Sequence, residues 1–298
     1  MKKIILAFLV VSIFLFSGCI FGGSTDTTTG AFAGGTSALE MSFIEGMPPE
    51  SILKNMNFNV GVLLENKGEA DVKAGDVLLT LNKPSEMTVE SSTKLANAKD
   101  LTRVKKVSDS IIPGKIEQVT WKNAKISGLS PLTEAQTVTV SVDACYPYST
   151  KLMVPACVAK GTEICNPKEN KLIESSGGPI QAVDFMQSTF TKDNKIELSF
   201  SFSVRSAADS IYSGTSSCSA LKSEKKNIVN IKSITLGNKL YPVSSCSPQE
   251  ITLSDNAQGS ARCKLVVDTT SDFQDSLVID LYYINKHRIS QEVSIDIQ

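Results

Sequence analysis

The sequence has very few of the residues and motifs on which common enzyme classes depend. It contains one histidine, His287, among 298 residues. It has no G-x-S-x-G motif, no glycine loop for phosphate and no EF-hand calcium loop. Its net charge is only −1 at pH 7, and Lys and Arg form no dense cluster. Such a chain offers nucleic acid little electrostatic attraction, so we predict no nucleic-acid partner. Because the phosphate and calcium motifs are missing, we also predict no cofactor.

Long apolar runs are also lacking, apart from one at the amino terminus. Residues 4–16 are apolar except for Ser12, and two lysines precede them. This run is shorter than the roughly 20 apolar residues that cross a bilayer, so it is typical of a secretory signal peptide. The alternative is an uncleaved anchor that continues through Ile20 and Phe21. Both interpretations place the rest of the chain outside the membrane, because the lysines stay on the cytoplasmic side.

The end of this run resembles the lipobox of prokaryotic lipoproteins. Small residues Ser17 and Gly18 precede Cys19, although Phe16 stands where that family usually has Leu. In the family, the cysteine becomes the lipid-modified first residue of the mature chain. The resemblance implies that residues 1–18 are a signal peptide. It also implies that a lipid on Cys19 anchors the protein to the extracytoplasmic face of the cell membrane.

Residues 19–38 follow the predicted cleavage site, and residues 22–38 within them are dominated by Gly, Ser and Thr. A segment of this composition cannot bury enough apolar surface to offset the entropy of ordering it. We therefore predict a flexible, lipid-anchored linker that spans about 20–25 Å on average. Thr27, Thr28 and Thr29 are candidates for O-linked sugars, and an unmodified spacer fits the composition equally well.

Apolar residues recur at every second position over much of the remaining chain. This is the period of a half-buried β-strand. The clearest segments are residues 58–64, 138–144 and 288–297. Long helical patterns are missing, and only residues 84–110 lack clear alternation. We expect a long loop with a turn of helix there.

Turn residues separate the predicted strands. The expected turns are Glu65–Gly68, Gly237-Asn238 and Asn285-Lys286-His287. His287 would then lie at a hairpin tip, exposed to solvent. The same parity places Trp121, which follows Val119 on an alternating strand, in the core.

A weak internal repeat becomes visible when the chain is shifted by 138 positions. Residues 58–64 then align with residues 196–202, and Ala70-Asp71 aligns with Ala208-Asp209, without a gap. About 280 mature residues are enough for two ordinary domains. We predict an all-β protein with two immunoglobulin-like β-sandwich domains, formed by residues 39–175 and 179–298.

The segment FNVGVLLENKGEADV, residues 58–72, resembles the immunoglobulin-like CARDB-type domains of archaeal and bacterial envelope proteins. The resemblance rests on an alternating strand, an Asn-x-Gly turn, and Ala-Asp leading to the next strand at Val77–Leu81. The segment ACYPYST, followed by more cysteines, also looks like secreted two-domain proteins of archaea. The resemblance implies an extracytoplasmic adhesive or spacer module. It brings no catalytic residues with it.

Cysteine usage supports export independently. Besides Cys19 there are six cysteines: Cys145, Cys157, Cys165, Cys218, Cys246 and Cys263. An even number in an exported chain predicts three disulfides, whereas a zinc site is disfavoured by the missing C-x-x-C and the single histidine. Fifteen connectivities are formally open. The strand spacing favours Cys145–Cys157 and Cys246–Cys263, which would leave Cys165–Cys218 to bridge the domains.

The sharpest enzymatic pattern is S-x-x-K. It occurs at Ser51, Ser91 and Ser219, and Ser254-Asp255-Asn256 matches the second element of penicillin-binding enzymes. No K-[ST]-G follows, and that class needs an α/β scaffold. We therefore interpret these matches as chance occurrences and predict that the protein is not an enzyme.

Two tyrosines are weak candidates for a binding surface. Tyr146 shares the parity of the apolar strand residues before it and is predicted to be core, whereas Tyr148 and Tyr282 are expected to be exposed.

We predict a non-catalytic binding or structural protein of the cell envelope, with an envelope protein, an S-layer or a glycan as its partner. The alternatives are a component of a self-assembling surface structure, which would act through exposed strand edges, and a hydrolase subunit with an unrecognised site.

Overall fold

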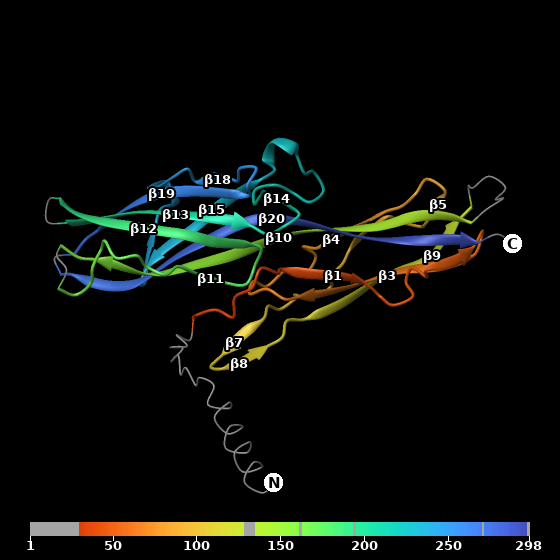
Figure 1. The fold of residues 1–298 in the computed structure, drawn as a ribbon, viewed down its shortest axis with the longest axis horizontal. Coiled ribbons are helices and arrows are strands. Elements are labelled where there is room, and N and C mark those ends of the chain that lie inside the picture. The colour runs from red at the N-terminus through yellow and green to blue at the C-terminus, as the bar shows by residue number, and fades with distance from the viewer. Residues whose placement is uncertain (1–29, 128–134, 161–162, 193–194, 270, 297–298) are drawn as a thin grey trace, which may run out of the picture. The chain divides into compact units, whose positions relative to one another are not determined.

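The protein folds almost entirely into β-strands (Figure 1). The computed structural model describes residues 30–127, 135–160, 163–192, 195–269 and 271–296. Within these ranges the only helices are two single 3-10 turns, η1 (Ser223–Lys225) and η2 (Val243–Ser245). No helix in the described ranges is long and apolar enough to cross a membrane. The predicted all-β class is confirmed.

Two four-stranded sheets share one arrangement of strands. The first has the order β1 (Leu39–Phe43), β3 (Asn57–Asn66), β9 (Ile116–Ile126), β5 (Met87–Thr88). The second has the order β12 (Ile180–Lys192), β13 (Lys195–Ser206), β19 (Gln258–Val267), β17 (Cys246–Ser247). All neighbours in both sheets are antiparallel. The two segments aligned by the sequence repeat, 58–64 and 196–202, therefore occupy the same place, the second strand of each sheet.

A third, ten-stranded sheet contains the longest strands. Its main path is β16 (Lys239–Tyr241), β15 (Ile228–Leu236), β20 (Phe273–Asp296), β10 (Gln136–Val158), β4 (Leu78–Asn82), β6 (Thr93–Leu95). Four short strands join beside this path: β2 (Ser51–Leu53), β11 (Glu174–Ser175), β14 (Ser210–Ser213) and β18 (Glu250–Thr252).

The two long strands of this sheet pair with each other along their whole length. The antiparallel ladder between β10 and β20 runs from Gln136 opposite Ile295 to Val158 opposite Phe273, with Tyr146 opposite Asn285 at its centre. On one side of this centre β4 pairs with β10, and on the other side β15 pairs with β20. Each long strand thus serves both ends of the sheet. Residues 31–298 accordingly form one compact unit.

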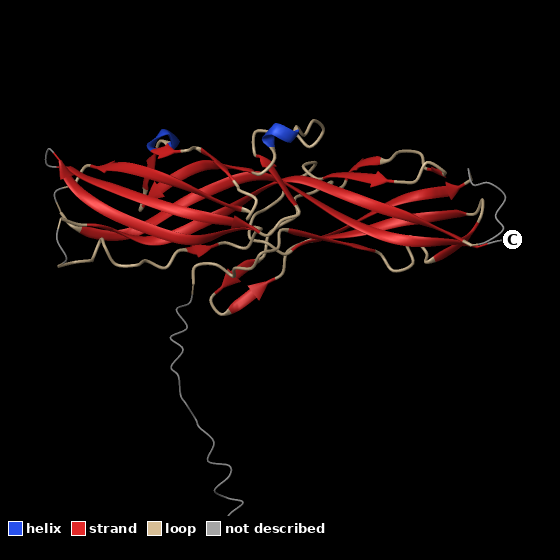
Figure 2. Cartoon of the chain, turned by 45° about the horizontal axis from the view of Figure 1, so that its top comes forward, coloured by secondary structure: helices blue, strands red, loops and turns tan. Residues whose placement is uncertain are grey.

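The core follows the predicted alternation. Val60, Val62 and Leu64 of β3 have no exposed surface, and Leu198 and Phe202 of β13 are at most 1% exposed. These side chains belong to one buried cluster that continues through all three large sheets. Figure 2 shows the strands stacked in two layers along much of the chain. Fully burying one such side chain contributes about 1.5–3 kcal/mol, so the cluster dominates the stability of the fold.

Trp121 lies in this core, as predicted. Its side chain is 1% exposed, and the ammonium nitrogen of Lys94 lies 5.9 Å from the centre of its ring. The turn at Gly237-Asn238 is also confirmed, because β15 ends at Leu236 and β16 begins at Lys239. Gly237 has a φ of +55°, and a Cβ atom there would collide with the carboxylate of Asp275. The positive φ therefore favours glycine at this turn.

The predicted long loop with a helical turn at residues 84–110 is wrong. This region contains the short strands β5 and β6 and most of a separate hairpin, β7 (Lys105–Val107) and β8 (Ser110–Ile112). Among the described strands, β7 and β8 pair only with each other, and they project at the bottom of Figure 1. Strands of two or three residues are too short to show a period of two, so the sequence pattern did not reveal them.

The predicted turn at Asn285-Lys286-His287 is also wrong. All three residues lie inside β20, which continues to Asp296, while Ile297 lies outside the described residues. The polar run resembles a turn in the sequence, but its side chains find partners in the fold. Asn285 bonds to Tyr146, Lys286 to Asp143, and His287 to Asp209.

Three disulfides join the six cysteines, with one of the three expected pairings. Cys246–Cys263 is confirmed, and the other two bonds are Cys145–Cys218 and Cys157–Cys165. The expected pairs Cys145–Cys157 and Cys165–Cys218 are wrong. Cys145 and Cys157 lie on one continuous strand, β10, and at about 3.3 Å per residue they are roughly 40 Å apart. The chain reverses only after Cys157, which brings Cys165 beside it.

Candidate functional site

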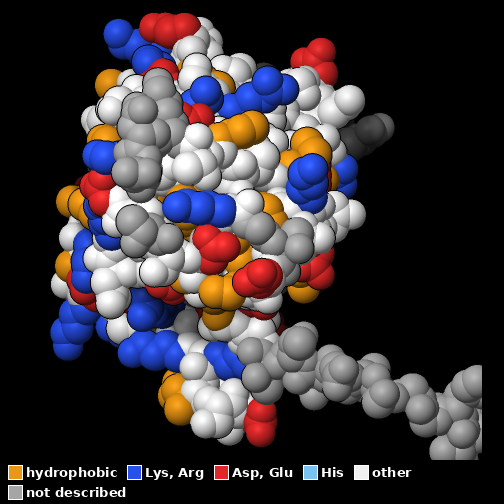
Figure 3. All heavy atoms as spheres, turned by 90° about the vertical axis from the view of Figure 1, so that its left-hand side faces the viewer, with side chains coloured by type: hydrophobic (Ala, Val, Ile, Leu, Met, Phe, Trp, Pro, Cys, Tyr) orange, Lys and Arg blue, Asp and Glu red, His pale blue; other side chains and the backbone are white. Residues whose placement is uncertain are grey.

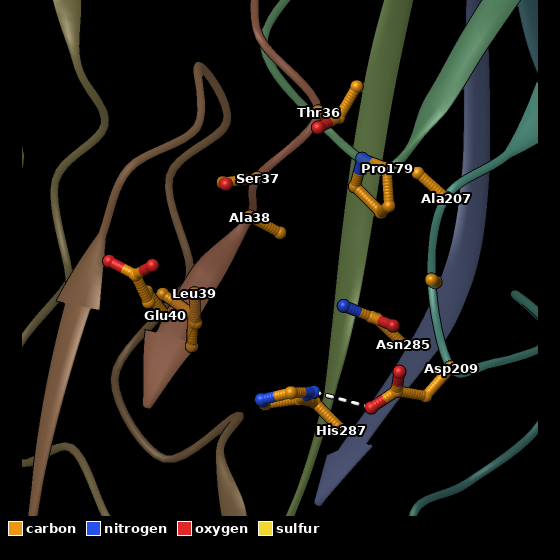
Figure 4. A pocket seen from close by; sticks show the side chains of 11 residues that line it. Thr36, Ser37, Ala38, Leu39, Glu40, Pro179, Ala207, Asp209, Asn285 and His287 are labelled. Carbon is orange, nitrogen blue, oxygen red and sulfur yellow. Dashed lines mark hydrogen bonds and ion pairs between the residues drawn. The ribbon is translucent and has the colours of Figure 1, made fainter. Parts of the chain in front are cut away.

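A hollow of about 200 Å³ lies beside the centre of the β10–β20 ladder. Four separate segments line it: residues 36–40 around the start of β1, Pro179 just before β12, residues 207–209 after β13, and Asn285 and His287 of β20. Figure 4 shows these side chains converging from the two sides of the hollow. The site thus exists only because β20 runs on without the expected turn.

A carboxylate and an imidazole meet in this hollow. Nδ1 of His287 lies 2.5 Å from Oδ2 of Asp209, and the two side chains are 35% and 58% exposed. The carboxylate fixes the orientation of the ring, and Figure 4 shows the other ring nitrogen turned away from Asp209. A contact this exposed contributes little to stability, so its effect is to position the ring.

A buried amide forms the floor of the hollow. Asn285 is 5% exposed, and its Nδ2 donates a hydrogen bond of 2.6 Å to the hydroxyl of Tyr146. That hydroxyl also accepts from the backbone N–H of Leu39 at 3.1 Å. Burial raises the pKa of Tyr146, which therefore stays protonated. The other amide atom, Oδ1 of Asn285, has no hydrogen-bond partner among the described residues.

This arrangement is suited to binding a small polar group. A buried acceptor without a partner costs about 1–3 kcal/mol, so a ligand or water that donates to Oδ1 of Asn285 would stabilise the site. Ser37 also lines the hollow, but Figure 4 shows its hydroxyl turned away from His287. Among the described residues, no cluster of three His, Cys, Asp or Glu side chains is placed to hold a metal ion.

The structure corrects the expected exposure of Tyr148. Its side chain is only 2% exposed. The hydroxyl accepts a hydrogen bond of 3.2 Å from the backbone N–H of Ala70, and its ring lies edge-on to Tyr146 at 6.0 Å. Tyr146 itself is buried, as predicted. Because β10 does not turn after Tyr146, Tyr148 keeps the inward parity of the strand.

Tyr282 is partly buried rather than freely exposed. Its ring packs against Gly214, and the ammonium nitrogen of Lys232 lies 5.5 Å from the ring centre. Burial raises the pKa of its hydroxyl. The residue lines a second hollow together with Cys218 and Ser219. Of the two tyrosines expected on the surface, only Tyr282 reaches a cavity.

The serines of the S-x-x-K matches are dispersed. Ser219 and Ser254 are exposed in loops, and Ser91 bonds locally to Thr93. Ser51 lies in β2, where its hydroxyl bonds to the carboxylate of Asp296. Ser219 and His287 line different hollows, so the structure does not bring these two residues together.

The amino-terminal predictions fall largely on residues outside the described ranges, including Cys19 and Thr27–Thr29. Residues 31–38 of the expected linker are described and lie along the folded unit. The backbone N–H groups of Ala33 and Gly34 donate to the carboxylate of Glu69 at 2.8 and 3.0 Å. The carbonyl of Gly35 accepts from Gly178 at 3.1 Å. The chain is thus held to the folded unit before β1 begins.

No protein-family model matches the chain, and no curated protein matches it in sequence. The functional argument therefore rests on the residues themselves. The sequence reasoning missed Asp209 and Asn285. No local pattern could have found them, because the partners of both lie far away in the chain: Asp209 is 78 residues from His287, and Asn285 is 139 residues from Tyr146.

Proposed function

We propose that the protein is a lipid-anchored, non-catalytic binding or structural protein on the extracytoplasmic face of the cell envelope. The observation that carries this proposal is the set of three disulfides. Disulfides persist in oxidising compartments, and they are rare in the reducing cytosol. The apolar amino-terminal run that ends in Cys19 supplies an export signal and an attachment point for the lipid.

The proposal includes the finer architecture. Residues 39–175 and 179–298 are two immunoglobulin-like β-sandwiches, interlocked because β10 and β20 each contribute to both. The shared strand order of the two four-stranded sheets and the repeat at 138 residues support it. Such modules present surfaces and hollows rather than reactive groups. The partner is an envelope protein, an S-layer or a glycan that contacts the hollow around Asn285 and His287.

The anchor is tested by changing Cys19→Ser in the native cell. The expected result is loss of lipid labelling and release of the protein from the membrane fraction, because each buried methylene of a lipid chain contributes about 0.8 kcal/mol to anchoring. Thr27→Ser is a matched control that should remain anchored. Retention of Cys19→Ser in the membrane at the unprocessed mass would favour an uncleaved anchor instead.

The non-catalytic role is tested in a cell-surface attachment assay. Ser219→Ala and Ser254→Ala should leave attachment and folding unchanged, because both side chains are exposed in loops. Asn285→Leu, which removes the buried amide, should weaken attachment, with circular dichroism as the control for folding. If a serine variant alone abolished the phenotype while folding stayed intact, an enzymatic role would replace the proposal.

A self-assembling surface component is the second candidate, and one surface favours it. Met186 and Phe190 of β12 and Val266 of β19 are 60%, 58% and 50% exposed on the strands of one sheet. A face of this kind suits contact with another copy. Phe190→Ser should then abolish concentration-dependent association in analytical ultracentrifugation, whereas a chain that stays monomeric at all concentrations would exclude this candidate.

A further inference from the structure

The β7–β8 hairpin has an unusual combination of exposed apolar and basic side chains. Val107, Ile111 and Ile112 are 54%, 62% and 48% exposed. The hairpin register places Ile112 opposite Lys105 and Ile111 opposite Lys106, whereas Val107 lies opposite Ser110. The hairpin belongs to no larger sheet among the described strands. An isolated two-stranded hairpin is at best marginally stable by itself. Its apolar side chains are exposed, so burial in the core of the protein does not explain why they are apolar.

The charge of this segment also differs from that of the whole chain. Residues 103–115 hold four basic residues and one acidic residue, Asp109, although the net charge of the protein is −1. Figure 3 shows blue basic side chains directly above orange apolar ones on the projection at the bottom of the molecule. We define residues 103–112 together with Phe32 as the hairpin surface.

A basic hollow of about 270 Å³ lies at the base of the hairpin. Arg103, Lys105, Lys106 and Lys151 line it, and so does Glu69. The carboxylate of Glu69 already accepts hydrogen bonds from the backbone N–H groups of Ala33, Gly34 and Gly177. The hollow is therefore left with a positive balance, which suits an anionic phosphate group.

The hairpin surface also lies where the chain arrives from its amino-terminal end. Ala31 and Phe32 line the same basic hollow. Ala31 is twelve positions after Cys19, so a lipid on Cys19 lies within about 40 Å of this hollow at full extension. For a flexible chain the average distance is about 20 Å. An anchored molecule thus holds the hairpin surface close to the headgroups.

We propose that the hairpin surface inserts into the headgroup region of an anionic lipid bilayer. Val107, Ile111 and Ile112 enter the boundary between headgroups and acyl chains, while Arg103 and Lys105 bind lipid phosphates. Exposed apolar side chains flanked by Lys and Arg are the combination that binds such interfaces. This inference rests on the proposed lipid anchor, and it adds a defined orientation of the protein on the membrane.

The test uses the full chain reconstituted with vesicles of phosphatidylcholine and phosphatidylglycerol whose acyl chains carry bromine. The protein has one tryptophan, Trp121, which is 1% exposed and is an internal control that bromine should not quench. Ile111→Trp should show a blue shift and a loss of emission of about twofold, because inserted side chains reach roughly 5–10 Å into the interface. Phe190→Trp, at an exposed position on β12, is the matched control and should not be quenched.

The charge requirement is tested in the Ile111→Trp background. R103Q/K105Q should lower the ratio of inserted to free hairpin by about fivefold per charge removed, and vesicles of phosphatidylcholine alone should also lower it. R262Q/K264Q removes the same two residue types from β19 and should change nothing. Equal quenching in neutral and anionic vesicles would overturn the proposal, as would equal quenching of the Phe190→Trp control.

The anchor and the hairpin fail separately in this experiment. Co-flotation of the wild type but not of Cys19→Ser tests the anchor, and quenching of Ile111→Trp tests the hairpin. Flotation without quenching overturns the hairpin inference alone, whereas flotation and quenching that persist in Cys19→Ser overturn the anchor alone. Absence of flotation in both overturns both. A blue shift that grows with protein concentration without vesicles would assign the hairpin surface to a second copy of the chain.

Discussion

The two four-stranded sheets share one strand order but close their last strand pair with different chemistry. In the first, Met87 of β5 faces Ile126, the last residue of β9, and both side chains are fully buried. In the second, Cys246 of β17 faces Cys263 of β19, and the two form a disulfide. Apolar packing and a covalent bond thus close equivalent junctions. The comparison shows that the strand order does not require either solution.

The difference extends to the two ends of the protein. All cysteines in the described residues lie between Cys145 and Cys263, so the sheet that contains β3 has no covalent link. Its buried aromatic side chains include Trp121 and Phe58, whereas the β13 sheet uses Phe185, Phe200 and Phe202. One end therefore depends on excluding water from a packed core. The other end is stabilised in addition by its disulfides, which reduce the conformational entropy of the unfolded chain.

The largest expected effect comes from the disulfide that ties the β14–β15 loop to β10. The double variant C145A/C218A should lower the free energy of unfolding by about 4 kcal/mol, because this bond closes a loop of 73 residues. C157A/C165A should cost only about 2.5 kcal/mol, because its loop has 8 residues. Urea denaturation of the two variants and the wild type measures which variant loses more unfolding free energy. Equal losses would show that native contacts, rather than loop closure, set the contribution.

The equivalent junctions offer a closer comparison. Met87→Ala should cost about 3 kcal/mol through a cavity, and C246A/C263A should cost about 3 kcal/mol through the loss of a 17-residue loop closure. Their responses to a reductant should differ. Dithiothreitol should lower the stability of Met87→Ala further, because it breaks the Cys246–Cys263 bond. It should lower the stability of C246A/C263A by less, because that variant no longer has this bond. Thermal unfolding with and without reductant provides the check.

Acid should affect the β10–β20 ladder near its centre. Burial alone would raise the pKa of Asp143, but hydrogen bonds from Arg288 at 2.9 Å and Lys286 at 3.0 Å lower it to about 2. A lowered pKa stabilises the fold above the unfolded value of about 3.9, and this contribution is lost as the pH falls towards 2. Because Arg288 is 56% exposed and screened by water, the loss should be at most about 2 kcal/mol.

The matched variant for this effect is Asp143→Asn. Its unfolding free energy should fall less than that of the wild type between pH 4 and pH 2, although it should be less stable at pH 6. Urea unfolding at three pH values measures the difference. Identical acid sensitivity in the two proteins would assign the loss to other carboxylates.

The smallest effect is expected at the β7–β8 hairpin. I111S/I112S should change the unfolding free energy by less than about 0.5 kcal/mol, because both side chains are exposed and the hairpin joins no larger sheet. Chemical denaturation without lipid measures this. A loss of several kcal/mol would mean that the hairpin packs on the fold and is not available to a membrane.

Local patterns in the sequence sufficed for much of the fold. Alternation over residues 58–64 and 138–144 predicted strands that lie in β3 and β10, the parity of Trp121 predicted its burial, and the repeat aligned two strands that hold equivalent places. Each of these depends on a side chain's position within a single strand. That position is fixed by the period of two in an extended backbone.

The candidate site could not be predicted in the same way. The polar residues Asn285-Lys286-His287 look like a turn when considered alone, and Tyr148 was expected to be exposed. In the structure β20 and β10 continue through both positions, and the side chains of Asn285, Lys286 and His287 contact Tyr146, Asp143 and Asp209. These partners lie 78 or more residues away in the chain. A local pattern carries no information about such distant partners.

By itself the sequence determined the all-β class, the inward parity of the strands and the single pairing Cys246–Cys263, where the chain returns after 17 residues. Only the tertiary structure decided the other two disulfides, the hollow at Asn285 and His287, and the exposure of the hairpin. The physical reason is that two strands, β10 and β20, run through both ends of the fold. Because β10 is long, Cys145 lies far from Cys157 and forms its bond with Cys218. The alternation of apolar residues does not predict the residue at which a strand ends.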